Sequence, residues 1–408
     1  MRASWITWLP MNTEVEYRAF ECSSNQTLST SWKSAKGYSR QINVGRFTDR
    51  YSMIHTAVMT HLQSDCKYEY HVGSGLFWSE TFKFNGRTPE DGNTTLASFI
   101  VYGDLGTGPY AEYTRVALKD ELKNNEYLAM IHLGDFAYDM EDREGRVGDL
   151  FMNNIEPYAA NYPYMTTTGN HEKFKNLTHY KDRFIMPWNE ASKNSSYFYS
   201  LNIGPLHMIF LNTYAYFKEK FINEVLTQTN WLIEDLKEAN KNRSLRPWIV
   251  ILGHHPLYCS VDWRIPTYPE NVDCQIDAPM LQSHLEDLAY TNGVDLFLTA
   301  HVHNYERDAA IYKNETIPSE LDTQNMHYNP NAPIYIVTGN AGNRRARNDP
   351  TSKTPQFWAR YLSDDYGYGR FKAYNETHIY YEQYSAQNKK TVDSVWIIKN
   401  RLSYAPLD

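Results

Sequence analysis

Side chains able to bind metal ions recur in five short segments of this chain. Four of the segments directly follow an apolar run typical of a buried strand, and the fifth follows residues 164–168. In open α/β sheets, ligands bind in the loops beyond the carboxyl ends of strands. We therefore expect the five segments to converge and to hold two metal ions that serve a hydrolytic reaction. The segments are Gly103-Asp104-Leu105-Gly106, Gly134-Asp135-Phe136-Ala137-Tyr138, Gly169-Asn170-His171-Glu172, Gly253-His254-His255 and His301-Val302-His303.

Seven side chains in these segments are candidate metal ligands, and they divide by chemistry. A hard trivalent ion prefers anionic oxygen, whereas a divalent first-row ion also accepts imidazole and carbonyl donors. Asp135 carries two oxygens and is the natural bridge between two ions. Three protein anions and one hydroxide leave a 3+/2+ pair net positive, which suits a phosphate dianion. The anionic donors are Asp104, Asp135 and Tyr138, and the neutral donors are Asn170, His254, His301 and His303.

Each segment taken alone also has a structural explanation. Gly-Asp pairs are common in turns, so Asp104 or Asp135 by itself would be a turn residue more often than a ligand. His254 by itself could be a buried histidine with a satisfied hydrogen bond. His301 and His303 are a better signal, because residues two apart on an extended chain point the same way. Chance placement of all five segments at five strand ends is a poor explanation, so the two-metal interpretation is preferred.

The elements that must position these residues change character along the chain. Residues 1–90 show short alternating strands separated by turns, which predicts a β-sandwich. From residue 96, strands alternate with helical periodicity, including helices predicted at residues 229–240 and 279–291. Residues 366–398 turn β-rich again and are expected to pack on the catalytic sheet. The predicted domains are therefore 1–90 and 96–400, of mixed α+β and α/β class, with the second including the C-terminal segment.

Composition limits the classes of partner. The net charge of -8 without a basic stripe argues against a dedicated nucleic-acid partner. No apolar stretch reaches the roughly 18 residues of a membrane span. Charged residues near the N-terminus interrupt any signal-peptide core, so no signal peptide is expected in this chain. The sequence does not predict an oligomeric state.

The cysteines and the glycosylation motifs bear on the compartment. Four cysteines in two local pairs fit two disulfides and an oxidising compartment, with four reduced thiols as the alternative. Seven Asn-x-Ser/Thr motifs add moderate support for a glycoprotein. The absence of a signal peptide argues the other way. The pairs are Cys22 with Cys66 and Cys259 with Cys274, and the motifs begin at Asn25, Asn93, Asn176, Asn194, Asn242, Asn314 and Asn375.

The five segments, in this order, resemble those of the purple acid phosphatases, a branch of the calcineurin-like metallophosphoesterases. The resemblance covers nearly the whole chain and is greatest to the animal long form. It implies a fibronectin type III-like β-sandwich followed by a metallophosphoesterase β-sandwich flanked by helices. It also implies a secreted, lysosomal or extracellular protein. The chain starts later than most members, as a shortened form would.

The resemblance also implies roles for the ligands. Asp104, Asp135, Tyr138 and His303 match the ferric site, and Asn170, His254, His301 and the shared Asp135 match a site for iron, zinc or manganese. Tyr138 is the discriminating residue, because most relatives outside this branch have a carboxylate there and use two divalent ions. A phenolate ligand would give a purple colour.

The implied reaction is hydrolysis of phosphomonoesters at an Fe(III)–M(II) centre by metal-activated hydroxide, with an acidic optimum. Asp135 and His171 are the expected catalytic residues, and Asn170, His171 and His255 the expected phosphate contacts. His171 could donate a proton to the leaving oxygen. Residues 256–278 contain no histidine, where relatives often place a leaving-group acid, so His255 is a candidate substitute. Ala300 stands where many members have glycine, and its methyl group is expected to be tolerated.

Two other functions fit parts of the pattern. A phosphodiesterase or protein phosphatase with two divalent ions is the nearer alternative, and Tyr138 with Gly106 argues against it. A non-catalytic binding protein with a decayed enzyme domain is the more distant one. That interpretation requires lost ligands, and none of the seven is missing.

Overall fold

The N-terminal strands form two sheets that pack against each other. The computed structural model describes residues 1–23, 31–86, 96–124, 127–188, 196–260, 274–343 and 355–400. Inward-facing residues such as Val15, Tyr17 and Phe84 form the core between the sheets. The disulfide Cys22–Cys66 joins neighbouring strands of one sheet. One sheet has the order β1 (Arg2–Thr7), β5 (Tyr51–Val58), β4 (Tyr38–Asn43), and the other β3 (Lys33–Lys36), β2 (Glu14–Cys22), β6 (Cys66–Ser74), β7 (Phe77–Trp78), with β8 (Phe82–Asn85) on β6.

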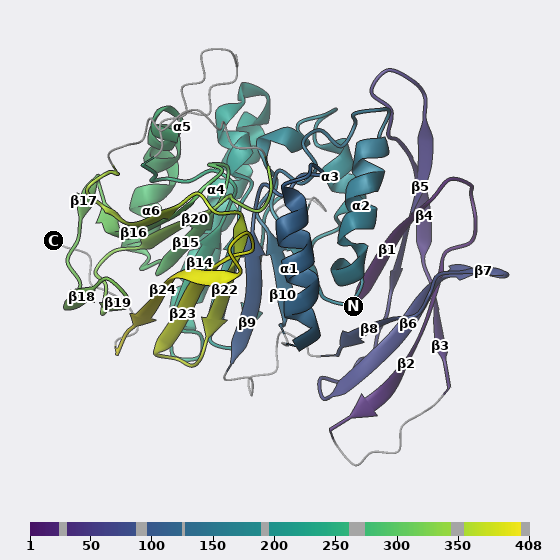
Figure 1. Ribbon diagram of the computed structural model, residues 1–408, viewed down its shortest axis with the longest axis horizontal. Coiled ribbons are helices and arrows are strands. Elements are labelled where there is room, and N and C mark those ends of the chain that lie inside the picture. The colour runs from purple at the N-terminus through teal and green to yellow at the C-terminus, as the bar shows by residue number, and fades with distance from the viewer. Residues whose placement is uncertain are drawn as a thin grey trace.

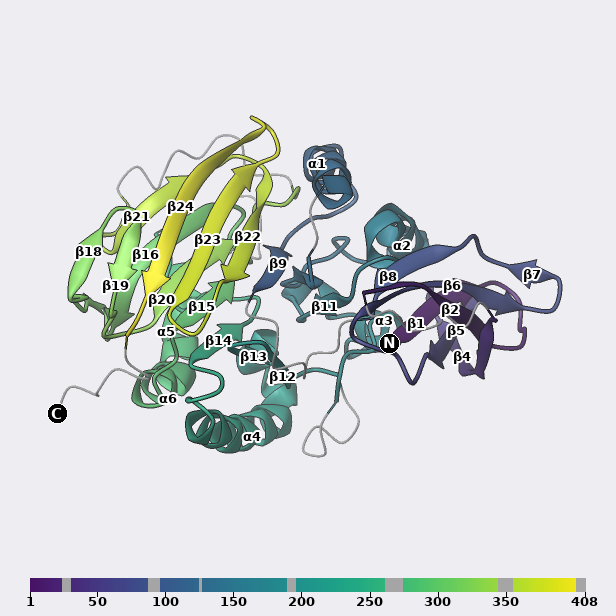
Figure 2. The same ribbon diagram turned by 90° about the horizontal axis from the view of Figure 1, so that it is seen from below.

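The rest of the described chain is built on two larger sheets that face each other (Figure 2). In the first sheet, the C-terminal strands add directly to β9, because β22 pairs with β9 antiparallel. Strands β23 and β24 alternate buried and half-buried residues, as antiparallel strands with one covered face do. The strand order is β11 (Tyr164–Thr166), β10 (Ala129–His132), β9 (Ala97–Tyr102), β22 (Gly367–Ala373), β23 (His378–Ser385), β24 (Lys390–Ile398), β19 (Met326–Tyr328), β18 (Leu321–Thr323).

The second sheet has a parallel centre of fully buried apolar strands. Strands β13, β14, β15 and β20 are parallel neighbours, and every residue of β13 and β14 is buried. Such continuous apolar runs are typical of parallel strands covered on both faces. The order is β12 (Tyr199–Ile203), β13 (Leu206–Phe210), β14 (Trp248–Leu252), β15 (Leu296–Thr299), β20 (Ile334–Thr338), β16 (Tyr305–Tyr312), β17 (Glu315–Thr316), with β21 (Ala359–Ser363) on β16.

Helices cover the outer face of the second sheet and the β9–β11 end of the first (Figures 1 and 2). Helices α1 (Ala111–Asn124), α2 (Arg146–Ala159) and α3 (Thr178–Arg183) lie on the side of β9–β11, and α2 and α3 separate these strands from the N-terminal sandwich. Helices α4 (Ile222–Lys241), α5 (Cys274–Leu281) and α6 (Asp287–Thr291) cover the other sheet. The predicted fold class, a β-sandwich followed by a metallophosphoesterase sandwich with flanking helices, is confirmed.

Two predicted helices begin earlier than the sequence signals suggested. Helix α4 starts at Ile222 rather than Thr229, because the 3₁₀ turns Thr213–Phe217 and Glu219–Phe221 lead directly into it. Helix α5 starts at Cys274, so Pro279 lies inside it. The polar strands β3 and β4 were not predicted, because most of their side chains are exposed. The predicted domain boundary, between residues 90 and 96, falls on residues 87–95, which lie outside the described residues.

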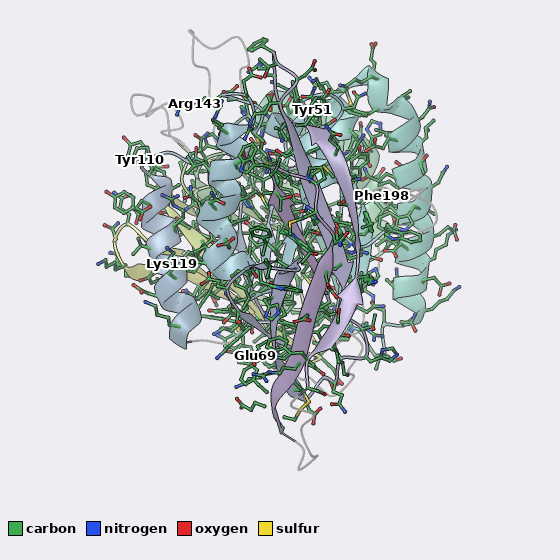
Figure 3. The ribbon with its side chains drawn as sticks, turned by 90° about the vertical axis from the view of Figure 1, so that its right-hand side faces the viewer. Tyr51, Glu69, Tyr110, Lys119, Arg143 and Phe198 are labelled. Atoms are coloured by element: carbon green, nitrogen blue, oxygen red, sulfur yellow. A yellow bond between two sulfur atoms is a disulfide. The ribbon has the colours of Figure 1, made fainter. Side chains whose placement is uncertain are left out.

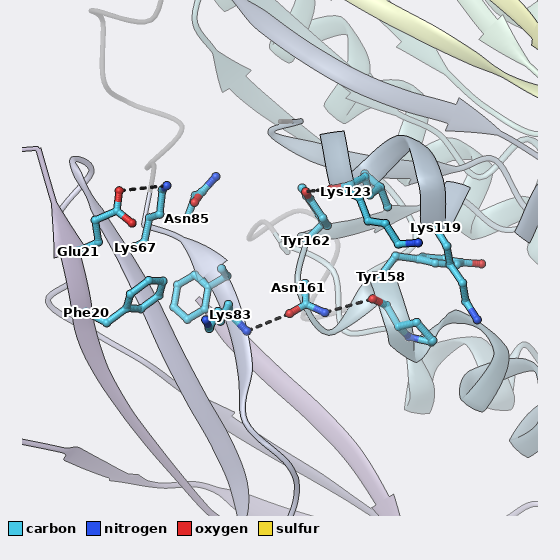
Figure 4. Close-up of a pocket in the computed structure, with 13 residues that line it drawn as sticks. Phe20, Glu21, Lys67, Lys83, Asn85, Lys119, Lys123, Tyr158, Asn161 and Tyr162 are labelled. Atoms are coloured by element: carbon cyan, nitrogen blue, oxygen red, sulfur yellow. Dashed lines mark hydrogen bonds and ion pairs between the residues drawn. The ribbon is translucent and has the colours of Figure 1, made fainter. Parts of the chain in front are cut away.

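A cleft separates the two regions on the side away from the predicted metal ligands. Its volume is about 640 Å³, and Lys67 and Lys83 from the sandwich face Lys119 and Lys123 of α1 across it (Figure 4). These α1 lysines lie toward the end of the helix, whereas Asp104 precedes its start. Within the described residues, no helix has the length and apolar composition needed to cross a membrane.

The disulfides and the exposed glycosylation motifs both agree with an oxidising compartment. Both predicted disulfides are present, Cys22–Cys66 and Cys259–Cys274. Disulfides persist in oxidising compartments, which indicates an extracytoplasmic protein. Three predicted glycosylation sites, Asn25, Asn93 and Asn194, lie outside the described residues, and the four described ones are exposed: Asn176, Asn242, Asn314 and Asn375.

Candidate metal centre

The loops that follow β9, β10, β11, β14 and β15 meet at one place between the two large sheets. The main-chain N–H of His301 donates to Asp104 Oδ2 at 2.8 Å, which joins the loop after β15 to the loop after β9. His254 Nδ1 lies 2.6 Å from the carbonyl of Leu133, which joins the loop after β14 to the end of β10. All seven predicted ligands are brought together by this arrangement, and they fall into two clusters.

The first cluster consists of Asp104, Tyr138 and His303. The Tyr138 hydroxyl lies 2.8 Å from Asp104 Oδ1 and 2.8 Å from His303 Nε2. His303 Nε2 lies 3.2 Å from Asp104 Oδ1. Ligands bound about 2.1 Å from one ion and at right angles to each other are about 3 Å apart. The three donor atoms therefore have the spacing of ligands around a single metal ion.

The second cluster surrounds His254. His254 Nε2 lies 3.1 Å from His301 Nδ1 and 3.2 Å from the side-chain oxygen of Asn170. It also lies 3.4 Å from Asp135 Oδ2. Ligand atoms of Asp104, Asp135 and His254 lie within 4.8 Å of one another, so Asp135 stands between the clusters. This placement supports the proposal that Asp135 bridges two ions.

The charge of the site fits a cation. Asp104 and Asp135 are 0 % and 1 % exposed, and neither forms an ion pair with Lys or Arg in the part of the chain that the structure describes. Burial of an unpaired carboxylate is costly, so buried carboxylates are paired or bind metal. Burial lowers the pKa of His254, but Asp135 and Asp104 together raise it to about 9. The site thus attracts positive charge, which a bound metal ion would supply.

Unusual backbone conformations place the ligands. Asp104, Asp135, Tyr138 and His301 all have positive φ, at 60°, 54°, 56° and 68°. Such conformations cost on the order of 1–3 kcal/mol each and persist where surrounding contacts enforce them. Glu172 provides three of these contacts. Its carboxylate accepts from the main-chain N–H groups of Asp135, Phe136 and Gly169, at 2.9, 3.0 and 2.7 Å.

The two candidate proton donors differ in exposure. The His171 side chain is 24 % exposed, and its Nδ1 lies 3.1 Å from Asp139 Oδ1. Burial lowers the pKa of His171, but Asp135 and then Asp139 raise it to about 9. His255 is only 3 % exposed, and its ring packs against that of His301, with centroids 4.2 Å apart. Burial, followed by His301, lowers the pKa of His255 well below its ordinary value. The geometry thus favours His171 as the proton donor.

Three supporting residues were missed by the sequence analysis. Asp139 contacts His171. Thr213 Oγ1 accepts from the main-chain N–H of His254 and His255, at 3.1 and 2.9 Å. Asn343 Nδ2 lies 3.3 Å from His303 Nε2. Thr213 and Asn343 follow strands β13 and β20, so a search of every strand end, rather than of recognisable motifs, would have found them.

Ala300, where many members of the resembled family have glycine, packs against Gly103 at the start of the loop that carries Asp104. A Cβ built on Gly103 would lie 2.4 Å from the Ala300 Cβ, so the Ala300 methyl fills the space that Gly103 leaves. Tyr305 and Arg307 of β16 bind the Asp393 carboxylate of β24, at 2.7 Å each. These contacts join the two large sheets.

Comparisons with protein families cover nearly the whole chain. Residues 1–85 match the model described as "Purple acid Phosphatase, N-terminal domain", residues 97–305 match "Calcineurin-like phosphoesterase", and residues 332–394 match "Iron/zinc purple acid phosphatase-like protein C".

Curated proteins and solved structures agree with these matches. The chain is 36% identical to acid phosphatase type 7 of Homo sapiens and 35% identical to that of Mus musculus, in each case over 98% of this chain and 88% of the relative. The solved structure of purple acid phosphatase PPD1 from yellow lupin seeds covers 98% of this chain and 72% of its own, with a TM-score of 0.78. Its sequence identity of 20% supports the fold alone.

Proposed function

This chain belongs to the purple acid phosphatase family and is homologous to acid phosphatase type 7, and we propose that it hydrolyses phosphomonoesters at a dinuclear Fe(III)–divalent metal centre. The observation that carries the proposal is the pair of ligand clusters with Asp135 between them. The iron would be held by Asp104, Asp135, Tyr138 and His303, and the iron, zinc or manganese of the second site by Asn170, His254, His301 and Asp135.

The metal ions, when bound, would polarise the phosphate and lower the pKa of water. The protein's own side chains would position the phosphate and transfer a proton. Asn170 and His171 are proposed to contact the phosphate, with His171 donating a proton to the leaving oxygen. Asp139 would fix the orientation of the His171 ring, since its Oδ1 lies 3.1 Å from His171 Nδ1. His255 is less suited than His171 to a direct role, because its ring is buried against that of His301.

The position of Tyr138 favours iron over a pair of divalent ions. Its hydroxyl lies at equal distance, 2.8 Å, from Asp104 Oδ1 and His303 Nε2, as a ligand to their shared ion would. A centre with two divalent ions, as in a phosphodiesterase or protein phosphatase, does not need this phenol. A non-catalytic role is disfavoured because all seven candidate ligands are present and lie together.

The visible absorption spectrum and metal content of the purified protein test the proposal. A broad purple or pink band that Tyr138→Phe abolishes, together with hydrolysis of p-nitrophenyl phosphate, is the expected result. A colourless protein with full metal occupancy would favour the two-divalent alternative. Asp135→Asn should lose most of the phosphatase activity, and equal activity would remove the catalytic assignment.

We also propose that the protein is a glycoprotein that is secreted or resides in lysosomes. The two disulfides and the four exposed glycosylation motifs support this location. Treatment with an N-glycan-removing enzyme should increase the gel mobility of protein from its native source. Unchanged mobility, with reduced thiols detected at all four cysteines, would contradict the proposal.

A further inference from the structure

We propose that the N-terminal sandwich is a positioning element of the catalytic centre, acting through a loop that fixes His171. This clamp loop, residues 44–50 between β4 and β5, binds a catalytic-domain segment, residues 139–149. That segment begins at Asp139, the residue that contacts His171. The inference rests on the proposed function, because it assigns the loop to the proton donor of that reaction.

Glu144 is the centre of the contact. Its carboxylate oxygen Oε2 accepts from the main-chain N–H of Phe47 at 3.2 Å and of Thr48 at 3.0 Å, and from the Thr48 hydroxyl at 2.7 Å. The Arg50 side chain in turn donates a hydrogen bond to the Glu144 carbonyl at 2.5 Å. One residue of the catalytic segment is thus held by both its side chain and its main chain.

Ion pairs extend the contact on both sides of Glu144. Arg46 lies 2.6 Å from Asp142 Oδ1, and Arg50 lies 2.7 Å from Asp149 Oδ2. Asp149 also pairs with Arg183 at 2.8 Å. The Arg50–Asp149–Arg183 group is largely shielded from solvent, so it is screened less by salt than the exposed Arg46–Asp142 pair.

The clamp loop and the catalytic segment approach each other closely at two glycines. A Cβ on Gly145, which has φ of 77°, would lie 2.6 Å from the Val44 carbonyl oxygen. A Cβ on Gly45 would lie 2.7 Å from the Glu144 carboxylate. Lys175 Nζ also reaches the carbonyl of Gly45, at 3.4 Å. The clamp loop therefore contacts the segment that carries Asp139 and the stretch that follows His171.

The catalytic segment needs such external support. Between Tyr138 and Gly145, five residues have positive φ: Tyr138, Asp139, Arg143, Glu144 and Gly145. The four that are not glycine cost on the order of 1–3 kcal/mol each. Two main-chain hydrogen bonds connect the clamped part of the segment to its start. Asp142 N donates to the Asp139 carbonyl, and Gly148 N donates to the Met140 carbonyl. Loss of the clamp should therefore relax Asp139 and, with it, His171.

The contact lies at one end of the interface between the two regions. Figure 3 shows Tyr51, which directly follows the clamp loop, at the same end of the molecule as Arg143, with Glu69 at the opposite end. Away from this end, Tyr70 OH donates to the carbonyl of Ala160 at 2.7 Å. Tyr70 therefore offers a matched control, because it also joins the two regions but contacts the far end of α2.

The experiment compares Glu144→Ala with the wild type on two substrates that differ in leaving group. Proton donation matters more for an alkyl phosphate than for p-nitrophenyl phosphate, whose leaving group is stable as an anion. We expect kcat for the alkyl phosphate to fall about tenfold, with a much smaller fall for p-nitrophenyl phosphate. Glu144→Gln, which keeps an acceptor oxygen, should restore most of the loss, and Tyr70→Phe should leave the ratio of the two substrates unchanged.

A double-mutant comparison decides whether the effect passes through His171. In a His171→Ala background, Glu144→Ala should have no further effect on the alkyl phosphate. Independent, multiplying losses would overturn the inference, as would equal losses on both substrates or a Tyr70→Phe variant that behaves like Glu144→Ala. These outcomes require an active wild type, so they are separate from failure of the proposed function, in which the wild type itself would hydrolyse neither substrate.

Discussion

At the scale of single residues, the centre is held by backbone as much as by side chains. Positive φ values at Asp104, Asp135, Tyr138 and His301 turn the ligands toward one place, and main-chain N–H groups bind the remaining carboxylate oxygens. A ligand so placed has little freedom to adjust. Adding even a methyl group beside such a ligand should therefore lower activity and metal binding strongly.

Gly169→Ala tests this directly. A Cβ at residue 169 would lie 2.1 Å from Asp135 Oδ1 and 2.6 Å from the Asp135 nitrogen, so the carboxylate must move. Since a displacement of about 1 Å can cost about 100-fold in rate, we expect a loss of that order with reduced metal content. Both are measured by steady-state assay and elemental analysis. Gly108→Ala, where no atom lies within 4 Å of the added Cβ, is the control. Wild-type activity in Gly169→Ala would show that Asp135 is free to adjust.

At the scale of elements, the sequence predicted the metal ligands at the ends of strands. It did not predict the contacts between loops that hold those ligands in place. The apolar runs before Asp104, Asp135, His254 and His301 marked four strands, and their motifs marked the ligands. Thr213 lies after β13 with no motif around it, and only tertiary packing brings it to His254. The polar strand β4 has no apolar periodicity, so the clamp loop that follows it could not be predicted.

Thr213→Val should weaken the second metal site without changing the fold of β13. The valine side chain is similar in size but accepts no hydrogen bond, so the N–H groups of His254 and His255 lose their shared acceptor. Loss of such supporting contacts typically reduces metal affinity about 10- to 100-fold. Equilibrium dialysis should show weaker binding of the divalent ion and unchanged iron content. Thr213→Ser keeps the oxygen and should bind as the wild type does, whereas equal weakening in both variants would contradict this role.

Strand β16 contains a second testable feature, the buried carboxyl groups of Asp308 and Glu306. Burial and then Glu306 raise the pKa of Asp308 well above its ordinary value. The folded state therefore keeps a proton that the unfolded chain releases above about pH 4. Stability is therefore lost as pH rises from this value toward the folded pKa of Asp308. Asp308→Asn has no such proton, so its unfolding free energy in urea should fall less steeply from pH 5 to pH 7. Parallel curves for the two proteins would show that Asp308 is ionised when folded.

At the scale of the whole molecule, two sheets from distant parts of the chain share one buried, charged centre. The loops after β9, β10 and β11 come from one sheet, and those after β14 and β15 from the other. Among the residues that the structure describes, only neighbouring histidines pair with the carboxylates of Asp104 and Asp135. Metal ions should therefore act as a link between the sheets as well as a reagent.

Metal removal should consequently lower the thermal stability of the catalytic region and leave the N-terminal sandwich less affected. A ligand present at 1,000 times its dissociation constant stabilises the folded state by about 4 kcal/mol. We expect a chelated sample to melt several degrees lower than the metal-loaded one in calorimetry, with the shift reversed by adding iron and a divalent ion. An Asp104→Asn, Asp135→Asn double variant is the control, because it has lost both buried charges and should melt at the same temperature with or without chelator. Equal melting temperatures for the chelated and loaded wild type would mean that the histidines alone balance the two carboxylates, and that no ion joins the sheets.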